Sequence, residues 1–216
     1  MEGIIYKVQP YQEHGRLCFT YTAQGKITLY AQGAQKVNHA SRILAQFLTK
    51  MSFKEGKKSF LPLQEGQILN DYQDIKSDFI KTKAAALMLE IIDKVVVENA
   101  NHELIYHELN LALDAPNVLV SSLSFAIKLI PEWGYGLSLK PDGRSIKGVS
   151  VTKGSLIYHD EEDPIDLDTK EAVSLLKLSV MPYGQLAIED LNLTKLKEFI
   201  AKYYSYHLQT TLKNLQ

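Results

Sequence analysis

Apolar residues change their spacing near residue 72, and this change constrains the fold more than any other feature of the sequence. Before that point they alternate with polar or small residues, a period typical of half-buried antiparallel strands. The alternating positions are Ile4, Tyr6, Val8, Leu17, Phe19, Tyr21, Ile27, Leu29 and Ala31. Beyond it they recur at helical spacing. The sequence therefore predicts an α+β fold, with a strand-built domain over residues 1–72 and a helical domain over residues 73–216.

Turn signals divide the first domain into short strands. Gly15, Gly25 and Gly56 permit the positive φ angles of tight turns. Two further strands are predicted at residues 47–53 and 60–69, around the last of these turns. Five short strands favour a small closed barrel, because closure removes exposed sheet edges. We therefore expect an OB-like β-barrel at the N-terminus.

The second domain begins with residues 83–97, which are apolar on nearly every side, as in a central buried helix. Asn101 can cap a second helix. The predicted buried face of that helix holds Leu104, Ile105, Leu111 and Ala112. A third helix is predicted over residues 114–130, where Pro131 ends it.

An insert is predicted at residues 134–166, which contain five glycines and few helix signals. Within it, residues 146–151 and 155–158 favour a short hairpin, and the acidic run 161–163 is expected to be a solvated loop.

Two helices are predicted after the insert. Asp168 with Glu171 resembles a capping box, which opens a helix that ends near residue 180. The last helix is predicted to start near Asn192, because apolar residues recur at helical spacing beyond it.

Composition excludes several classes of protein. The single cysteine, Cys18, excludes an intramolecular disulfide and a multi-cysteine zinc site, and its apolar neighbours favour a buried thiol. Phosphate-binding and nucleophile-elbow motifs are missing, so we expect a binding protein without a cofactor rather than an enzyme. The chain also lacks a signal peptide and a long apolar run, which favours a cytoplasmic protein without a membrane partner.

Charge is distributed unevenly along the chain. Residues 1–70 hold nine Lys and Arg against four Asp and Glu, a net charge of +5, whereas the whole chain has −1. OB barrels bind nucleic acid by combining a cationic groove with stacking aromatics. The predicted DNA contacts are Arg16, Lys26, Lys36, Arg42, Lys54, Lys57 and Lys58. The alternative for each is an ordinary solvated charge.

Aromatic residues of the first domain offer surfaces on which bases can stack. Tyr6, Phe19, Tyr21 and Tyr30 are the candidates, and the strand pattern favours the barrel core for Phe19 and Tyr21. In the second domain Lys128 lies within an apolar run. A cation at an apolar edge suits a ligand with hydrophobic and acidic groups, although a lysine that reaches water from an amphipathic helix has the same pattern.

Several short segments resemble the RecO family of DNA-repair proteins, in the same order along the chain. They are residues 2–8, 25–27, 33–42, 89–93, 125–135 and 206–213. The resemblance implies binding of single- and double-stranded DNA, strand annealing, contact with the acidic tail of single-strand-binding protein, and cooperation with RecR in loading a recombinase. It assigns Lys36 and Arg42 to DNA and suggests Lys128 for the tail.

The sequence departs from this family in three places. Gln35 stands where the family usually has arginine, and residues 45–47 lack a proline that the family has; both weaken the resemblance at the proposed DNA face. Many members hold zinc with paired cysteines, one pair of which would fall near residues 139–143, where this chain has none. The resemblance therefore implies a variant without zinc, in which residues 140–160 are held by packing alone or are mobile.

Two other functions remain open at this point. The modest charge of the first domain is compatible with a protein-interaction scaffold that binds no nucleic acid. An OB-like barrel is equally compatible with RNA binding. Competition between DNA and RNA oligonucleotides, at low and high salt, separates these alternatives.

Overall fold

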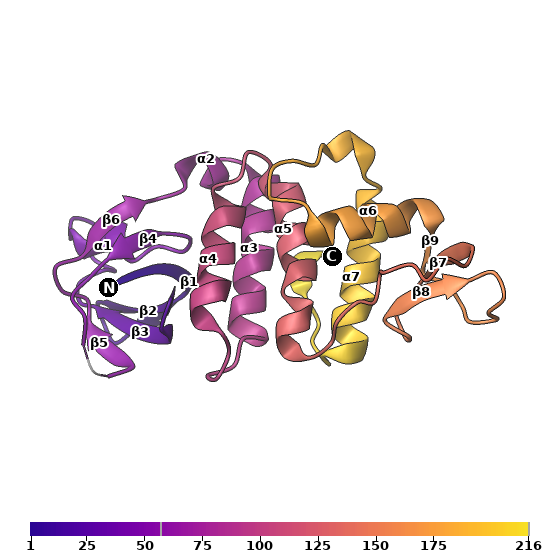
Figure 1. The fold of residues 1–216 in the computed structure, drawn as a ribbon. Coiled ribbons are helices and arrows are strands. Elements are labelled where there is room, and N and C mark those ends of the chain that lie inside the picture. The colour runs from indigo at the N-terminus through magenta and orange to yellow at the C-terminus, as the bar shows by residue number, and fades with distance from the viewer. Residues whose placement is uncertain (57, 216) are drawn as a thin grey trace. The chain divides into compact units, whose positions relative to one another are not determined.

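The computed structural model of the chain describes residues 1–56 and 58–215. It contains two compact units, residues 1–108 and 109–216 (Figure 1). The division of the chain into domains at residue 72 stays a prediction.

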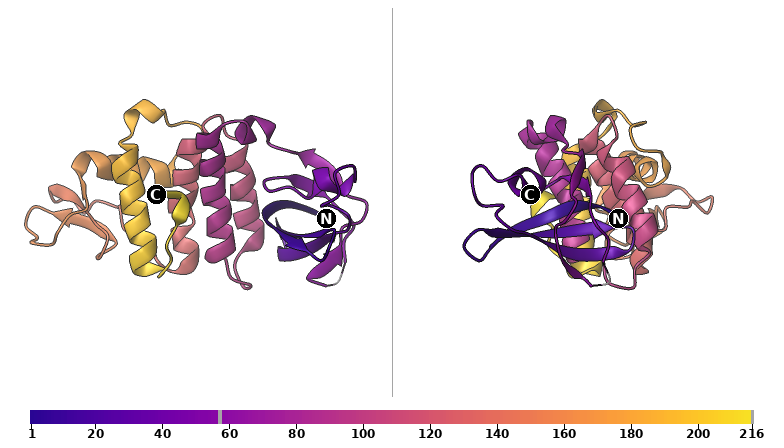
Figure 2. Two further views of the ribbon diagram at one scale, coloured as in Figure 1. Left: turned by 180° about the vertical axis from the view of Figure 1, so that it is seen from behind. Right: turned by 90° about the vertical axis from the view of Figure 1, so that its left-hand side faces the viewer.

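A curled six-stranded sheet forms the start of the first unit (Figure 2). Its strands are β1 Glu2–Tyr11, β2 Gly15–Thr22, β3 Gly25–Ala31, β4 Lys50–Ser52, β5 Phe60–Pro62 and β6 Gln67–Asn70. Their order is β5-β3-β2-β1-β4-β6, and the β3–β5 pair is parallel whereas the others are antiparallel. The α+β class with an OB-like N-terminal sheet is therefore confirmed.

The later strands differ from the prediction. Residues 47–53 contribute only the short β4, because Leu48 takes a positive φ of 53° just before it. Residues 60–69 divide into β5 and β6, since Glu65 also takes a positive φ, 54°, and turns the chain. The prediction of five strands was wrong, and β5 and β6 are the edges of the sheet over the part of the chain that the structure describes.

Small and aliphatic side chains fill the inside of this sheet. The buried cluster consists of Ile5, Cys18, Leu29, Ala31, Ala34, Ala45, Met51 and Phe53. Cys18 is fully buried, and this burial raises the pKa of its thiol to about 12, so the expectation of a structural thiol is confirmed. Tyr21 is also buried, as predicted, whereas Phe19 is only half-buried.

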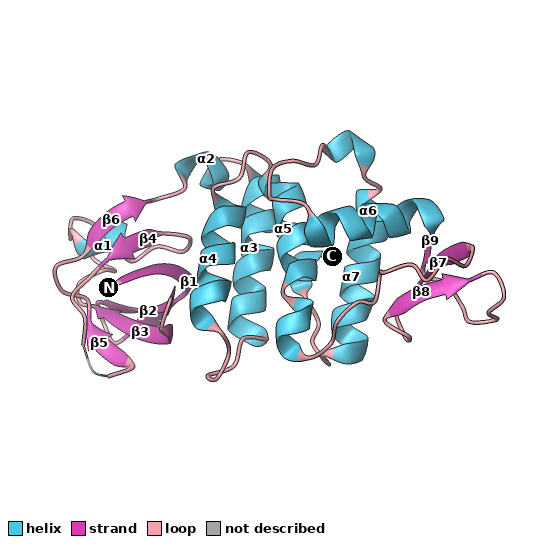
Figure 3. Ribbon diagram, viewed as in Figure 1, coloured by secondary structure: helices cyan, strands magenta, loops and turns pink. Residues whose placement is uncertain are grey.

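The helices of the first unit follow the sheet (Figure 3). They are α2 Gln73–Lys76, α3 Phe79–Lys94 and α4 His102–Leu113, which continues into the second unit; a short α1, Ser41–Leu44, lies between β3 and β4. The buried central helix is confirmed as α3, with different ends. It starts earlier than predicted because Asp78 accepts hydrogen bonds from the backbone N–H groups of Ile80 and Lys81.

The buried face of α4 differs from the one predicted. Ile105, Leu109 and Ala112 are buried, whereas Leu104 and Leu111 are 39% and 46% exposed. The spacing i, i+4, i+7 places the three buried residues on one helical stripe, and the predicted set mixed two faces.

The second unit contains α5 Val118–Lys128, α6 Thr169–Val180 and α7 Leu193–His207, with 3₁₀ turns at Ile130–Trp133, Ile188–Asp190 and Lys213–Leu215. The third predicted helix was too long at both ends. It starts after Asn117, whose side chain accepts the Val120 N–H, and Pro131 lies in the following 3₁₀ turn. The cap predicted at Asp168 is confirmed, and so is the start of the last helix near Asn192, whose side chain caps it.

A small sheet of order β8-β7-β9 forms the insert, from β7 Ile146–Ser150, β8 Ser155–Tyr158 and β9 Leu167–Asp168. The predicted hairpin is confirmed as β7–β8. The third strand comes from residues where no strand was predicted.

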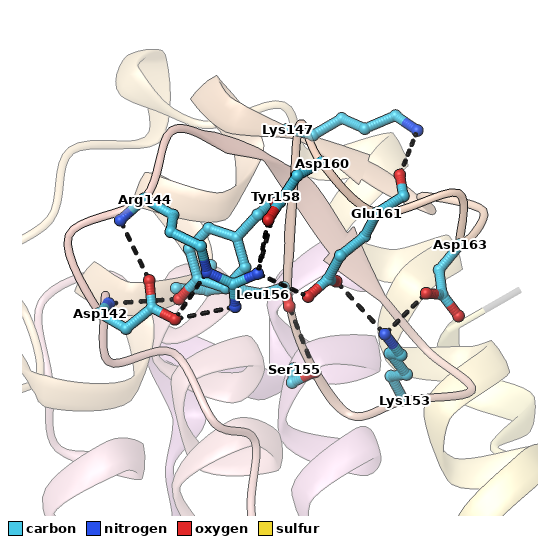
Figure 4. A network of polar contacts seen from close by, with 10 residues as sticks. All are labelled: Asp142, Arg144, Lys147, Lys153, Ser155, Leu156, Tyr158, Asp160, Glu161 and Asp163. Atoms are coloured by element: carbon cyan, nitrogen blue, oxygen red, sulfur yellow. Dashed lines mark hydrogen bonds and ion pairs between the residues drawn. The ribbon is translucent and has the colours of Figure 1, made fainter.

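Ion pairs join the loops around this hairpin (Figure 4). The Arg144 guanidinium pairs with Asp142 at 2.8 Å, Glu161 at 3.1 Å and Asp160 at 3.2 Å. Lys153 pairs with Glu161 at 3.2 Å and with Asp163 at 2.6 Å. We call these residues the hairpin ion network. Residues 161–163 form a loop, as expected, and the Glu161 and Asp163 carboxylates of this loop take part in the network.

Candidate nucleic-acid interface

Residues 32–40 form an irregular segment that connects β3 to α1. Gly33 has a φ of 72°, and a Cβ at this position would lie 2.7 Å from the His39 ring. The Lys36 N–H donates to the Gly33 carbonyl at 2.9 Å, and the Arg42 N–H donates to the His39 carbonyl at 2.9 Å. Glycine is therefore required both for the turn and for the close approach of His39.

Hydrogen bonds from Gln35 hold this segment against the β1–β2 turn, and Arg16 holds the residue after α1. The Gln35 N–H donates to the His14 carbonyl at 3.0 Å, and the Gln35 side-chain amide donates to the Gly15 carbonyl at 2.7 Å. The Arg16 guanidinium donates to the Ala45 carbonyl at 3.0 Å, just after α1. Gln35 and Arg16 therefore fix the positions of Lys36 and Arg42 relative to the sheet.

A cavity of about 440 Å³ lies between the β1–β2 turn and this segment. Tyr30 contributes an aromatic ring to its lining. The polar residues of the lining are Gln12, Glu13, His14, Gln32, Lys36 and His39, so one carboxylate lies among them. We call it the turn cavity. A cation, two imidazoles and side-chain amides around one hollow can bind an anionic ligand that also has hydrogen-bonding edges.

Of the predicted DNA contacts, Lys36 lines the cavity, Arg42 lies on the following helix α1, and Arg16 reaches the residue after that helix. Lys36 and Arg42 form no ion pair with a carboxylate among residues 1–56 and 58–215. Lys54 is near α1 in the fold. Its partner in an ion pair is Glu65, and the residue after Glu65, Gly66, packs against Leu44 of α1. The Lys54 ammonium lies 3.1 Å from the Glu65 carboxylate.

The other predicted contacts lie elsewhere. Lys58 precedes Ser59, and the Ser59 carbonyl accepts a hydrogen bond from the Thr28 N–H. The irregular segment starts after Ala31, at the other end of β3. Lys58 therefore lies about 10 Å along β3 from that segment. Lys57 lies outside the described residues.

The Lys26 ammonium forms hydrogen bonds within the fold. Its ammonium donates to the carbonyls of Asp93 at 3.0 Å and Val96 at 2.7 Å, around the C-terminal end of α3. Cations are favourable at that end of a helix. Burial lowers the pKa of Lys26, and the Asp93 carboxylate partly opposes this.

The four aromatic residues proposed for base stacking also differ in their surroundings. Tyr30 lines the turn cavity, and its ring meets that of Tyr11 edge-on with centroids 5.5 Å apart. Tyr6 and Tyr21 are buried in the sheet, and burial raises the pKa of Tyr6 to about 12. Only Tyr30 among the four therefore lies in this site.

Lys128 occupies the last turn of α5 in the second unit. Its ammonium lies 4.0 Å from the centroid of the Tyr183 ring, a cation–π distance. The lysine is half-buried, so its surroundings combine an aromatic face with a positive charge.

Sequence reasoning missed His14 and His39, and it noted Gln35 only as a departure from the family. Each lies in a turn or an irregular segment, where no periodicity indicates its neighbours. The β1–β2 register, which pairs Tyr11 with Gly15, is the signal that places His14 at a hairpin tip.

Comparison with known proteins gives a consistent result over the whole chain. The sequence model of the family described as "Recombination protein O C terminal" matches residues 76–216, well over half of the chain. The chain belongs to the recombination protein O family. A protein of Bacillus cytotoxicus named "DNA repair protein RecO" is 25% identical over 99% of this chain and 94% of its own length. Its namesake in Bacillus mycoides is 24% identical, over 99% and 93%.

Membership of the RecO family confirms the resemblance described above and a role in DNA repair. Zinc does not fit the position where many relatives in the resemblance hold it. Residues 139–143 supply a single carboxylate, Asp142, which is bonded to Arg144. No helix in the described ranges is long and apolar enough to cross a membrane.

Proposed function

We propose that this chain is a recombination mediator that binds single- and double-stranded DNA through the β1–β2 turn and residues 30–45. The observation that supports this most is the pair Lys36 and Arg42, which Gln35 and Arg16 hold in place without a described carboxylate as partner. Such cations remain available to neutralise phosphates. We leave Lys26 out of the proposed interface, because its ammonium binds the end of α3.

The proposed activity is strand annealing without a nucleotide cofactor and without catalysis. Neutralised phosphates allow two complementary strands to approach, and base pairing then supplies the favourable free energy. The proposed partners follow the family: RecR, and single-strand-binding protein, from whose complex with DNA the chain would help to load a recombinase.

An annealing assay tests this proposal. Full-length chain is mixed with complementary oligonucleotides, without ATP, and the rate of duplex formation is followed by fluorescence. We expect acceleration by the wild type and its loss in the Lys36→Gln, Arg42→Gln double variant. The matched control is Lys170→Gln with Lys177→Gln, two exposed lysines of α6. An equal rate in both double variants would contradict the assignment.

For the contact with single-strand-binding protein we propose Lys128 and Tyr183. The cation suits the acidic part of the tail, and the ring offers an apolar surface. Titration of a tail peptide is expected to show weaker binding to Lys128→Glu and unchanged binding to the control Lys177→Glu. Equal affinity of all three proteins would reject this site.

A further inference from the structure

We propose that Lys26 is a positioning residue: its ammonium reaches from the β2–β3 turn to the C-terminal end of α3 and, together with His102, fixes the α3–α4 loop to the sheet. The loop consists of residues 95–101, and all of these contacts lie within the first unit. This role goes beyond the proposed DNA binding, because it gives a basic residue of the N-terminal sheet a task that involves no nucleic acid.

The C-terminal end of α3 lacks a cap of its own. Helices commonly end at a glycine in the left-handed conformation, which allows their last carbonyls to be satisfied locally. Residues 95–101 contain no glycine, and none of them takes a positive φ. The carbonyls of Asp93 and Val96 instead accept hydrogen bonds from the Lys26 ammonium, 67 and 70 positions earlier in the chain. The end of α3 therefore depends on the sheet.

Lys26 holds this helix end more firmly than Lys7 does. The Lys7 ammonium lies 3.4 Å from the Asp93 carboxylate, but both side chains are more than a third exposed, so the pair contributes little. Lys26 is half-buried, and two carbonyls replace the water that its ammonium gives up on burial. Removal of this one ammonium therefore breaks both contacts with the helix end.

His102 fixes the other end of the loop to the same part of the sheet. The Glu98 carbonyl can only accept, so Nε2 of His102 carries a proton and donates to it at 2.9 Å. In that tautomer Nδ1 accepts a hydrogen bond from the Tyr21 hydroxyl of β2 at 3.0 Å. Tyr21 is fully buried, and burial raises the pKa of its hydroxyl, which therefore stays a donor.

Gly25 allows the two contacts to form side by side. It precedes Lys26 in the turn and has a φ of 118°. A Cβ at this position would lie 3.2 Å from Nε2 of His102, closer than side chains normally approach. The glycine therefore lets His102 come up to the turn, while the lysine that follows it binds the end of α3.

The proposed DNA interface and the contact with α3 lie at opposite ends of β2. The strand starts at Gly15, whose carbonyl accepts the Gln35 side chain, and it ends at Thr22, which pairs with Gly25. A strand of this length spans about 23 Å. Loss of the Lys26 ammonium should therefore leave the phosphate contacts at the other end unchanged.

Amide hydrogen exchange of the full chain tests this role in Lys26→Met, which keeps an unbranched side chain and removes its donors. The Val95 amide reports on the helix end, and the Met88 amide, in the middle of α3, reports on the whole unit. Exchange at Val95 is expected to accelerate about tenfold relative to Met88, because hydrogen bonds to a charged group are lost. Lys26→Arg keeps a cationic donor and is expected to restore slow exchange.

A second variant and a control separate the two ends of the loop. His102→Phe keeps a ring and removes both ring nitrogens. It should accelerate exchange of the Ala100 amide, which donates within the loop, more than exchange at Val95. The matched control is Lys54→Met, because the Lys54 ammonium pairs with Glu65 and not with the loop. This control should exchange like the wild type at both amides.

DNA binding distinguishes the positioning role from a phosphate contact. Lys26→Met should keep the wild-type slope of log affinity against log salt for a thymidine oligomer. A lysine that binds a phosphate would reduce this slope by about 1 when it is replaced. A wild-type chain that binds no DNA would contradict the proposed function, and the exchange rates would still decide the role of Lys26.

Three results would each contradict the positioning role. The first is exchange at Val95 that accelerates no more than at Met88 in Lys26→Met. The second is Lys26→Arg exchanging as fast as Lys26→Met, and the third is a salt slope reduced by about 1.

Discussion

Basic residues of the turn cavity and of the β7–β8 hairpin have opposite environments. Lys36 and Arg42 are held in place by neutral hydrogen bonds from neighbouring groups, and none of the described carboxylates forms an ion pair with them. In the hairpin, Arg144 and Lys153 each pair with at least two carboxylates. The same residue types are therefore available to a polyanion in one region and neutralised in the other.

The two regions also differ in what stabilises them. The sheet beside the turn cavity encloses a buried apolar cluster around Leu29 and Met51. The loops around the hairpin are joined by ion pairs whose members are mostly exposed, so each pair contributes little. Local pairing, rather than the number of basic residues, therefore decides which of these cations remain available to a polyanion.

The largest effect is expected from the apolar core. Leu29→Ala removes a fully buried side chain from the apolar cluster of the sheet, and it should lower the free energy of unfolding by about 2–5 kcal/mol. Urea denaturation at low and high salt measures this, and the loss should be the same at both. A salt-dependent loss would show that charge pairs, not packing, hold this region.

The next effect concerns DNA affinity. Lys36→Gln with Arg42→Gln should lower affinity about tenfold and reduce the slope of log K against log salt by about 2, because two phosphate contacts are lost. Lys147→Gln with Lys153→Gln should change neither quantity. Equal losses in the two double variants, measured by fluorescence anisotropy, would remove the distinction between the regions.

A smaller effect is expected when a positioning residue is removed. Gln35→Ala deletes the side-chain hydrogen bond to the Gly15 carbonyl and leaves all cations in place. Affinity for single-stranded DNA should fall by about threefold with an unchanged salt slope, since the number of phosphate contacts is the same. A reduced slope would mean that Gln35 affects the number of contacts rather than their position.

The smallest effect is expected in the hairpin ion network. Hydrogen bonds from the Arg144 side chain and backbone lower the pKa of Asp142 below its ordinary 3.8. A carboxyl group with a lowered pKa stabilises the folded state above its ordinary pKa and loses this contribution as pH falls through the folded value. Amide exchange of residues 141–161, corrected for intrinsic rates, should therefore accelerate below about pH 4. Arg144→Gln should remove this pH dependence.

Periodicity was enough to predict much of this fold. Alternation of apolar and polar residues predicted β1 to β3, because each strand has one buried face. The capping box at Asp168 predicted the start of α6, and helical spacing predicted that of α7. It failed for β4 to β6, where Leu48 and Glu65 take left-handed conformations that no residue preference indicates.

The candidate site could be predicted only in part. Lys36 and Arg42 follow from sequence, because they lie in an irregular basic segment. The contacts of Gln35 with Gly15 and of Arg16 with Ala45 join residues that are 20 and 29 positions apart, so they depend on the register of the sheet. The structural environment of Lys26 depends likewise on α3, 67 positions away.

The most direct test of this account is amide chemical-shift mapping of the ¹⁵N-labelled full chain during titration with a short thymidine oligomer. The account predicts that shifts gather at residues 11–16 and 30–45, while the hairpin ion network at residues 142–163 stays unperturbed. Shifts concentrated in the hairpin, with residues 30–45 unchanged, would contradict it.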